Sequence, residues 1–229
     1  DPRWFANGPF QCRAMGEHRW RFLWQSLTDL ERSLRALGQR LHIAFGEPEQ
    51  ALPGLVHQHS VDRVIRSRQP GTIEAQQWQT LQQKLPNTLF QEFETLSLYT
   101  EGSLPMPLSE LPGTFSQFRK RIEKQGDRGP DLLRIRTLTA LPPPPGFPED
   151  NRGECPPIPE PSSALTFTGG ETAGLARLQE YCFGNHGIAT YKETRNALDD
   201  WDSSSKFSPW LANGSLSARE VAATIEDYE

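Results

Sequence analysis

Residues 63–93 read RVIRSRQPGTIEAQQWQTLQQKLPNTLFQEF, and the fold class of the N-terminal part follows from them. Arg63–Ser67 predicts a short strand, Thr72–Lys84 has the length and composition of a helix, and residues 88–93 predict a second strand. Strand, helix and strand in this order are typical of a parallel sheet against which the crossover helices pack. We therefore expect an α/β domain.

The sequence before this stretch extends the same alternation. Apolar residues recur in steps of three and four from Trp20 to Leu37, which predicts a helix with one apolar face. Residues 41–45 are predicted to form a strand parallel to the other two, and residues 49–57 a short helix. A complete doubly wound domain has a strand before such a first helix. No such strand is predicted here, and the chain opens without Met. Residues 1–139 are therefore predicted to be an incomplete, Rossmann-like parallel domain in a fragment.

Proline marks the boundary between two parts of the chain. Nine of the 20 prolines lie in residues 142–161, where they prevent a helix or a central strand, so residues 140–164 are predicted to be an extended linker. Strand alternation disappears in residues 165–229. Two pairs with capping-box spacing precede predicted helices there, Thr168 with Glu171 and Ser217 with Glu220. The expected architecture is α/β plus all-α, joined by a Pro-rich linker.

Composition excludes several classes of protein. Hydrophobic residues make up 35% of the chain, enough for a packed core, but no stretch reaches the ~18 apolar residues of a membrane span. The three cysteines lack Cys-x-x-Cys spacing, so we expect no metal site and a reducing location, the cytoplasm or an organelle interior. Residues 1–139 carry 18 Lys and Arg against 15 Asp and Glu, whereas residues 140–229 carry 6 against 14. The acidic second part is a poor surface for nucleic acid.

Residues 203–208, Ser-Ser-Ser-Lys-Phe-Ser, are a candidate anion site. They supply hydroxyl groups, backbone N–H groups and one cation directly before Pro209, a residue favoured at the start of a helix. Such a set suits a phosphate or pyrophosphate. The alternative is a solvated, serine-rich loop that caps the next helix with Ser208.

Several stretches in order along the chain resemble one family. They are Asp1-Pro2-Arg3 with Gly8-Pro9-Phe10, then residues 115–120 (FSQFRK), 169–175 (GGETAGL), 190–196 (TYKETRN) and 203–214 (SSSKFSPWLANG). Together they closely resemble the photolyase/cryptochrome family, with its DASH cryptochrome branch as the nearest match. The resemblance implies an α/β antenna domain that can hold a folate, followed by the beginning of a helical FAD-binding domain.

The resemblance also assigns candidate flavin contacts. Tyr191 would lie against the adenosine-phosphate side of FAD. The phosphate-binding loop would consist of five consecutive residues: Ser204, Ser205, Lys206, Phe207 and Ser208. The residues that contact the isoalloxazine ring and the dimer would follow Glu229, so no catalytic residue is assigned.

The antenna site departs from the family pattern. Members commonly place an acidic residue after the strand, and the corresponding position here is Gln69. Glu74 is the nearest carboxylate, and Gln117 in the FSQFRK stretch is the candidate for a second contact to a pterin. A glutamine can hydrogen-bond the edge of a pterin ring, but without the assistance of a charge.

Two functions from different classes are compatible with these residues. The first is a flavin-dependent blue-light protein that repairs cyclobutane pyrimidine dimers in single-stranded DNA, or senses light. In it, reduced FAD would donate an electron to a dimer that is flipped out of the stack. The alternative is a truncated, non-catalytic family member, a binding or assembly subunit without flavin. In that case a protein partner would cover the truncated faces.

Overall fold

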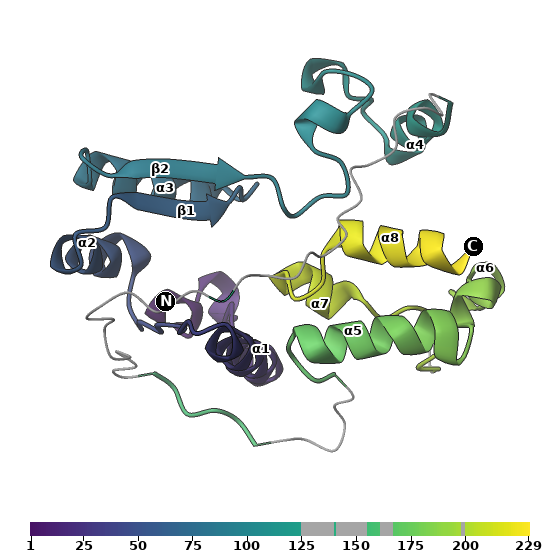
Figure 1. Ribbon diagram of the computed structural model, residues 1–229, viewed down its shortest axis with the longest axis horizontal. Helices are drawn as coiled ribbons and strands as arrows, with labels where there is room; N and C mark the ends of the chain where they lie inside the picture. The colour runs from purple at the N-terminus through teal and green to yellow at the C-terminus, as the bar shows by residue number, and fades with distance from the viewer. Residues whose placement is uncertain (125–139, 141–154, 161–166, 198–199) are drawn as a thin grey trace.

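The computed structural model describes residues 1–124, 140, 155–160, 167–197 and 200–229. Figure 1 shows an N-terminal part with helices and a small sheet, beside a C-terminal part made of helices. Most of the predicted linker lies outside the described residues. Its described segment, residues 155–160, runs without regular structure along helix α1 (Glu17–Ala36). There the Trp20 Nε1–H donates to the Pro156 carbonyl at 3.3 Å, and Arg21 Nη1 donates to the Glu160 carbonyl at 3.0 Å.

The sheet confirms the central prediction. Strands β1 (Arg63–Ser67) and β2 (Leu89–Phe93) pair in parallel, and the helix between them is α3 (Thr72–Lys84). Trp78 of α3 packs edge-on against Phe90 of β2, with ring centroids 4.8 Å apart. The crossover helix therefore packs against one face of the strand pair, as the strand–helix–strand pattern predicts.

The third predicted strand is absent from this sheet. Within residues 41–45 only Ala44 takes part in a β-bridge, and the sheet contains β1 and β2 alone among the described residues. The Leu41 amide donates instead to the Glu31 side chain of α1 at 2.6 Å. Because a strand needs a neighbouring backbone that pairs with it over several residues, a run with a single bridge residue follows the end of α1 as an irregular segment. The prediction for residues 41–45 was wrong.

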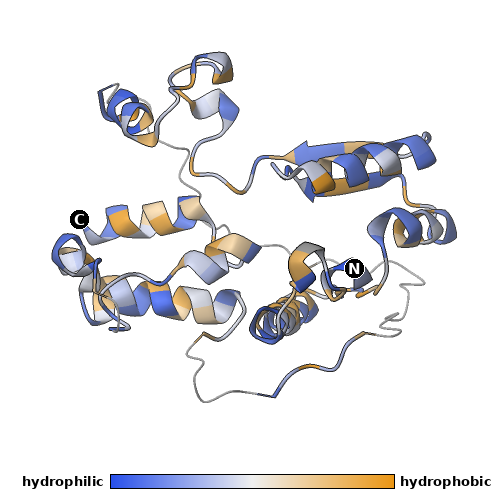
Figure 2. Ribbon diagram, turned by 180° about the vertical axis from the view of Figure 1, so that it is seen from behind, coloured by the Kyte–Doolittle hydropathy of each residue, from blue (hydrophilic) through white to orange (hydrophobic). Residues whose placement is uncertain are grey.

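The second face of the strand pair carries three partly exposed apolar side chains. Side chains alternate along each strand, so this face carries Ile65, Leu89 and Phe93, with exposed fractions of 56%, 53% and 48%, together with three polar residues, Arg63, Ser67 and Gln91. Figure 2 shows hydrophobic residues on both strands. A protein partner on such a face stays a prediction.

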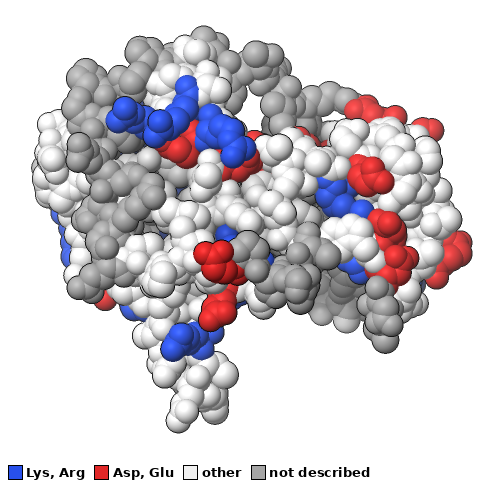
Figure 3. All heavy atoms as spheres, turned by 90° about the horizontal axis from the view of Figure 1, so that it is seen from below, with Lys and Arg blue, Asp and Glu red and all other residues white. Residues whose placement is uncertain are grey.

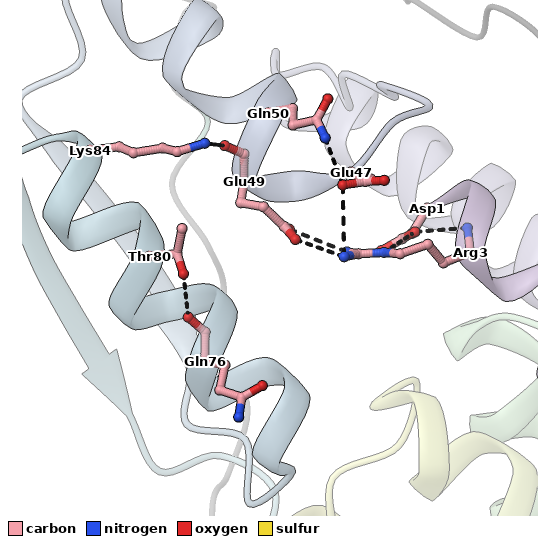
Figure 4. Close-up of polar contacts among 8 residues, drawn as sticks. All are labelled: Asp1, Arg3, Glu47, Glu49, Gln50, Gln76, Thr80 and Lys84. Atoms are coloured by element: carbon pink, nitrogen blue, oxygen red, sulfur yellow. Dashed lines mark hydrogen bonds and ion pairs between the residues drawn. The ribbon is translucent and has the colours of Figure 1, made fainter.

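Charged contacts join the first turn of the chain to the helices around the sheet. Arg3 binds Asp1 in its own turn, and its Nη1 donates to Glu49 of α2 (Pro48–Gln58) at 2.7 Å, as Figure 4 shows. Lys84, at the end of α3, donates to the Glu49 carbonyl at 2.7 Å. The hydrogen bond from Arg3 lowers the pKa of the Glu49 carboxyl below its usual value. Residue 49 thus links the N-terminal turn, α2 and α3.

Short elements connect the sheet to helix α4 (Phe115–Lys124), which lies apart from the strands in Figure 1. The 3-10 turns of the described N-terminal part are Pro2–Trp4, Pro9–Gln11, Glu101–Ser103 and Leu108–Glu110. Among the described residues no helix is long and apolar enough to span a membrane.

The C-terminal part is helical, as predicted. Its helices are α5 (Glu171–Gln179) with a π-helical turn at Glu180–Gly184, a 3-10 turn at Gly187–Thr190, α6 (Tyr191–Thr194), α7 (Ser208–Asn213) and α8 (Ala218–Tyr228). One core cluster joins them through Leu178, Tyr181, Cys182, Phe207, Trp210 and Leu216. Apolar residues from α5, α7 and their flanking turns therefore form a common interior.

Helix α1 caps helix α5 across the boundary between the two parts. The buried Asp29 carboxylate accepts hydrogen bonds from the Thr172 amide and the Thr172 hydroxyl, each at 2.9 Å. The N-cap residue of α5 is Gly170, whose φ of 110° is a value that glycine adopts without steric strain. The prediction of Thr168 as cap was therefore wrong, because a carboxylate from another helix satisfies this N-terminus. The Ser217 prediction is confirmed, since its side chain accepts from the Arg219 amide at the start of α8.

We expect Asp29→Ala to lower the free energy of unfolding by about 1–3 kcal/mol, because it leaves a buried helix N-terminus without its acceptor. Urea denaturation followed by circular dichroism measures the change. Arg32→Ala is the matched control: it removes the ion pair to Asp29 from a side chain that is mostly exposed, and we expect a loss of about 0.5 kcal/mol. Equal losses in both variants would show that the ion pair, rather than the cap, stabilises the joint.

Candidate functional site

The candidate anion loop comprises residues 200–208, between α6 and α7. Its first turn is fixed from inside: Ser203, 1% exposed, donates its hydroxyl to the Asp200 carbonyl at 2.8 Å. The Thr194 hydroxyl, at the end of α6, donates to the Ser203 carbonyl at 2.7 Å. The loop is therefore a packed part of the fold, and the alternative of a solvated loop is not supported for its first half.

Arg177 of α5 holds the middle of the loop. Its side chain is buried, and its guanidinium donates to three carbonyls and one carboxylate. Nε reaches Ser205 O at 3.2 Å and Nη2 reaches both Trp201 O and Ser204 O at 3.2 Å. Nη1 reaches Asp202 Oδ1 at 2.7 Å. The guanidinium carbon also lies 5.2 Å from the ring centroid of Tyr181 and 5.0 Å from that of Trp201.

The second half of the loop changes direction at Lys206. Lys206 has a φ of 58°, in the left-handed region that costs a side-chain-bearing residue about 1–2 kcal/mol. Phe207 follows, buried, with its ring edge-on to Tyr181 at 5.8 Å between centroids. A strained residue directly before a buried aromatic anchor indicates that the surrounding structure imposes the turn.

Ser208 starts α7 differently from the prediction. The N-cap position belongs to Phe207, the Ser208 side chain makes no capping hydrogen bond, and Pro209 is the second residue of the helix. Because Phe207 already has right-handed helical angles, the helix begins one residue earlier than the serine cap requires. The Ser208 hydroxyl is exposed and belongs to the outer surface of the loop.

Tyr191 lies beside the loop. It is the first residue of α6, is 42% exposed, and precedes Thr194, the residue that binds the Ser203 carbonyl. Burial raises the pKa of the neighbouring Tyr181 phenol, and the closeness of Tyr191 raises it further. Tyr191 and the loop are thus brought to one region of the C-terminal part.

The antenna candidates do not come together. Gln69 lies in the exposed turn after β1, and Glu74 lies exposed in the first turn of α3, so these two share one end of the sheet. Gln117 is exposed on α4, which Figures 1 and 2 show well apart from α3. Among the described residues there is also no group of three or more His, Cys, Asp or Glu side chains placed to hold a metal ion.

Sequence reasoning missed Arg177. In the structure Arg177 anchors the loop, in part through its ion pair with the Asp202 carboxylate. One signal was available: an arginine stands inside the apolar run of α5, next to Leu178. A buried guanidinium requires internal partners, and the carbonyls of a nearby loop are suitable acceptors.

Comparisons with known proteins agree with this architecture. The model of the DNA photolyase family matches residues 2–145 of the chain. The chain belongs to the photolyase/cryptochrome family. Its similarity is to the DASH branch: it is 40% identical over 225 residues to the "Cryptochrome DASH" of Idiomarina loihiensis, covering 97% of this chain and 48% of that relative.

Two further family members extend the comparison. The chain is 32% identical to the "Cryptochrome DASH, chloroplastic/mitochondrial" of Oryza sativa, covering 100% of this chain and 44% of the relative. The crystal structure of a Synechocystis sp. PCC6803 cryptochrome superposes with a TM-score of 0.86 at 34% identity, over 100% of this chain and 48% of that one. The chain therefore spans about half the length of the family members it matches.

Proposed function

We propose that this chain is part of a flavin-dependent blue-light protein of the DASH cryptochrome kind. It contributes the α/β antenna domain and the loop that binds the phosphates of FAD. The observation that carries the proposal is the 200–208 loop, held by Arg177 and with left-handed backbone angles at Lys206, in a chain of this family. The proposed location is the cytoplasm or an organelle interior, in keeping with the name of the rice relative.

The loop fits the negatively charged part of such a cofactor. In the described part of the chain, the backbone amides of Ser204, Ser205 and Lys206 donate to no protein acceptor. Successive free amides around a left-handed residue form a concave donor site for anions. Tyr191 offers an exposed ring beside the loop for the adenosine side, and Lys206 supplies a cation.

The chemistry of the complete protein is proposed from the family. Reduced flavin supplies a light-driven electron to a cyclobutane pyrimidine dimer in single-stranded DNA, or the same cofactor serves as a light sensor. Figure 3 shows acidic and basic side chains in small neighbouring groups, without a continuous basic stripe among the described residues of that face. By the family resemblance, the dimer pocket belongs to the part of the fold that this chain does not span, and we assign the main DNA contacts to that part.

A folate antenna is a second, separate part of the proposal. Gln69 and Glu74 lie at one end of the sheet and offer an amide and a carboxylate to a pterin ring. Gln117 contributes only if α4 approaches them in the complete protein. This contact is tested by comparing the folate absorbance of the purified wild-type protein with that of Gln69→Ala. Gln79→Ala, on the exposed side of α3, is the control.

Flavin binding is tested in a chimera that joins residues 1–229 to the C-terminal part of the Idiomarina loihiensis relative. We expect flavin to copurify, and light to restore a dimer-containing single-stranded oligonucleotide. Flavin without restoration of the dimer would favour light sensing. A folded chimera without flavin would contradict the proposal and favour the non-catalytic alternative.

In the same chimera we expect Ser205→Ala with Lys206→Glu to lower flavin occupancy about tenfold or more. The change places a negative charge where the phosphates bind and removes a hydroxyl donor. Flavin absorbance per mole of protein measures occupancy, and circular dichroism reports folding. Ser109→Ala with Lys124→Glu makes the same change of charge at exposed positions outside the loop and should leave occupancy unchanged. Unchanged occupancy in the loop variant would show that the loop does not bind the flavin.

A further inference from the structure

We infer that Arg177 is a positioning residue that orients the amides of the anion loop toward the ligand. The inference rests on the proposed binding of flavin phosphates by this loop and assigns the residue that prepares it. Arg177 is 6% exposed, so the proposal gives it no direct contact with the ligand. Its role is to fix the backbone.

The direction of the amides follows from the planarity of the peptide bond. The carbonyls of Ser204 and Ser205 both point at the guanidinium, and the described residues contain no cis peptide. In a trans peptide the N–H is antiparallel to the C=O of the same unit. The amides of Ser205 and Lys206 are therefore directed away from Arg177 and away from the core.

A neighbouring contact repeats this arrangement. The Ser203 carbonyl accepts from the Thr194 hydroxyl inside the fold, which directs the Ser204 amide to the opposite side of that peptide unit. Three consecutive carbonyls are thus held by internal donors, and the three amides that follow them remain available. The left-handed angles of Lys206 close the curve of this segment, as in known anion-binding backbone nests.

Arginine is suited to this task and lysine is not. The guanidinium is planar, with donors in a fixed fork, and here three of its nitrogens reach four acceptors at once. The rings of Tyr181 and Trp201 lie close to it and restrict its orientation. A lysine would keep the charge near Asp202, but one ammonium cannot hold the carbonyls of Trp201, Ser204 and Ser205 together.

The test uses the 229-residue chain with inorganic pyrophosphate at constant ionic strength, observed by NMR of the backbone amides. We expect pyrophosphate to shift the amides of Ser205 and Lys206 in the wild type. In Arg177→Lys these two shifts should disappear and binding should weaken about tenfold, while circular dichroism and the Trp210 indole signal stay as in the wild type. Arg219→Lys is the matched control, because Arg219 also donates to two backbone carbonyls, those of Glu94 and Ser97, outside the loop.

The outcomes distinguish a failure of the inference alone from a failure of the proposed function. Absence of any shift in the wild type would contradict phosphate binding by the loop, and the inference with it. Equal shifts and affinity in the wild type and in Arg177→Lys would overturn the inference alone. Amide exchange of the free wild type gives a check that needs no variant: Ser205 and Lys206 should exchange rapidly, and protection of both would also overturn it.

Discussion

Trp210→Ala is expected to lower the free energy of unfolding by about 3–5 kcal/mol, the range for removing a large aromatic side chain from a packed core. Trp210 is 2% exposed and belongs to α7, directly after the anion loop. Its ring contacts Phe22 of α1 and Phe167, with centroids 6.0 Å and 5.6 Å away, and its Nε1–H donates to the Thr168 carbonyl at 3.0 Å. The substitution leaves a cavity and also a buried carbonyl without its donor.

Urea denaturation followed by far-ultraviolet circular dichroism measures this loss. Leu211→Ala is the matched control: it is the next residue of the same helix, and its side chain is partly exposed. The control should cost less than about 1 kcal/mol, because little apolar area leaves the core. Similar losses in the two variants would show that Trp210 is not the anchor between α7, α1 and the start of α5.

The sequence predicted the elements whose stability is encoded locally. Strands β1 and β2 and helix α3 were predicted to within one residue, because their apolar patterns and lengths lie in one continuous stretch of 31 residues, 63–93. Residues 41–45 have a similar apolar pattern, and they do not join the sheet. A strand depends on a neighbouring backbone, and no local pattern reports whether that neighbour is there.

The site was predictable in its composition but not in its construction. Three consecutive serines, a lysine and the family resemblance pointed to residues 203–208. The contacts that shape the loop come from Arg177 and Thr194, and the cap on α5 comes from Asp29, 143 residues away in sequence from Thr172. Such partners depend on the packing of α1 against α5, and capping-box spacing cannot reveal them because it compares residues three apart.

Helix α5 connects the two parts of the molecule to the anion loop. Asp29 of α1 holds its N-terminus, and Arg177, two turns further on, holds the loop. A change that moves the start of α5 away from α1 is therefore expected to affect both the stability of the joint and the position of the guanidinium. Gly170, the N-cap residue of α5, lies against Asp29 of α1 and offers a test of this connection.

Gly170→Ala is expected to destabilise the fold by about 2–5 kcal/mol, from backbone strain and from overpacking. The φ of Gly170 is 110°, which side-chain-bearing residues rarely adopt, and an added Cβ would lie 2.7 Å from the Asp29 Cβ and 2.8 Å from its Oδ2. Neither helix can move aside without disturbing the hydrogen bonds that Thr172 donates to the Asp29 carboxylate. The variant should therefore also weaken the pyrophosphate-dependent shifts of the Ser205 and Lys206 amides, because α5 carries Arg177.

Gly54→Ala is the control for this substitution. Gly54 lies inside α2, has nothing within 4 Å of an added Cβ, and has no positive φ. Alanine there should stabilise the helix by about 0.5–1 kcal/mol, since it reduces the freedom of the unfolded chain. Thermal denaturation of both variants gives the comparison. If Gly170→Ala melted at the wild-type temperature with the amide shifts intact, the close packing of α5 on α1 would not be what positions the loop.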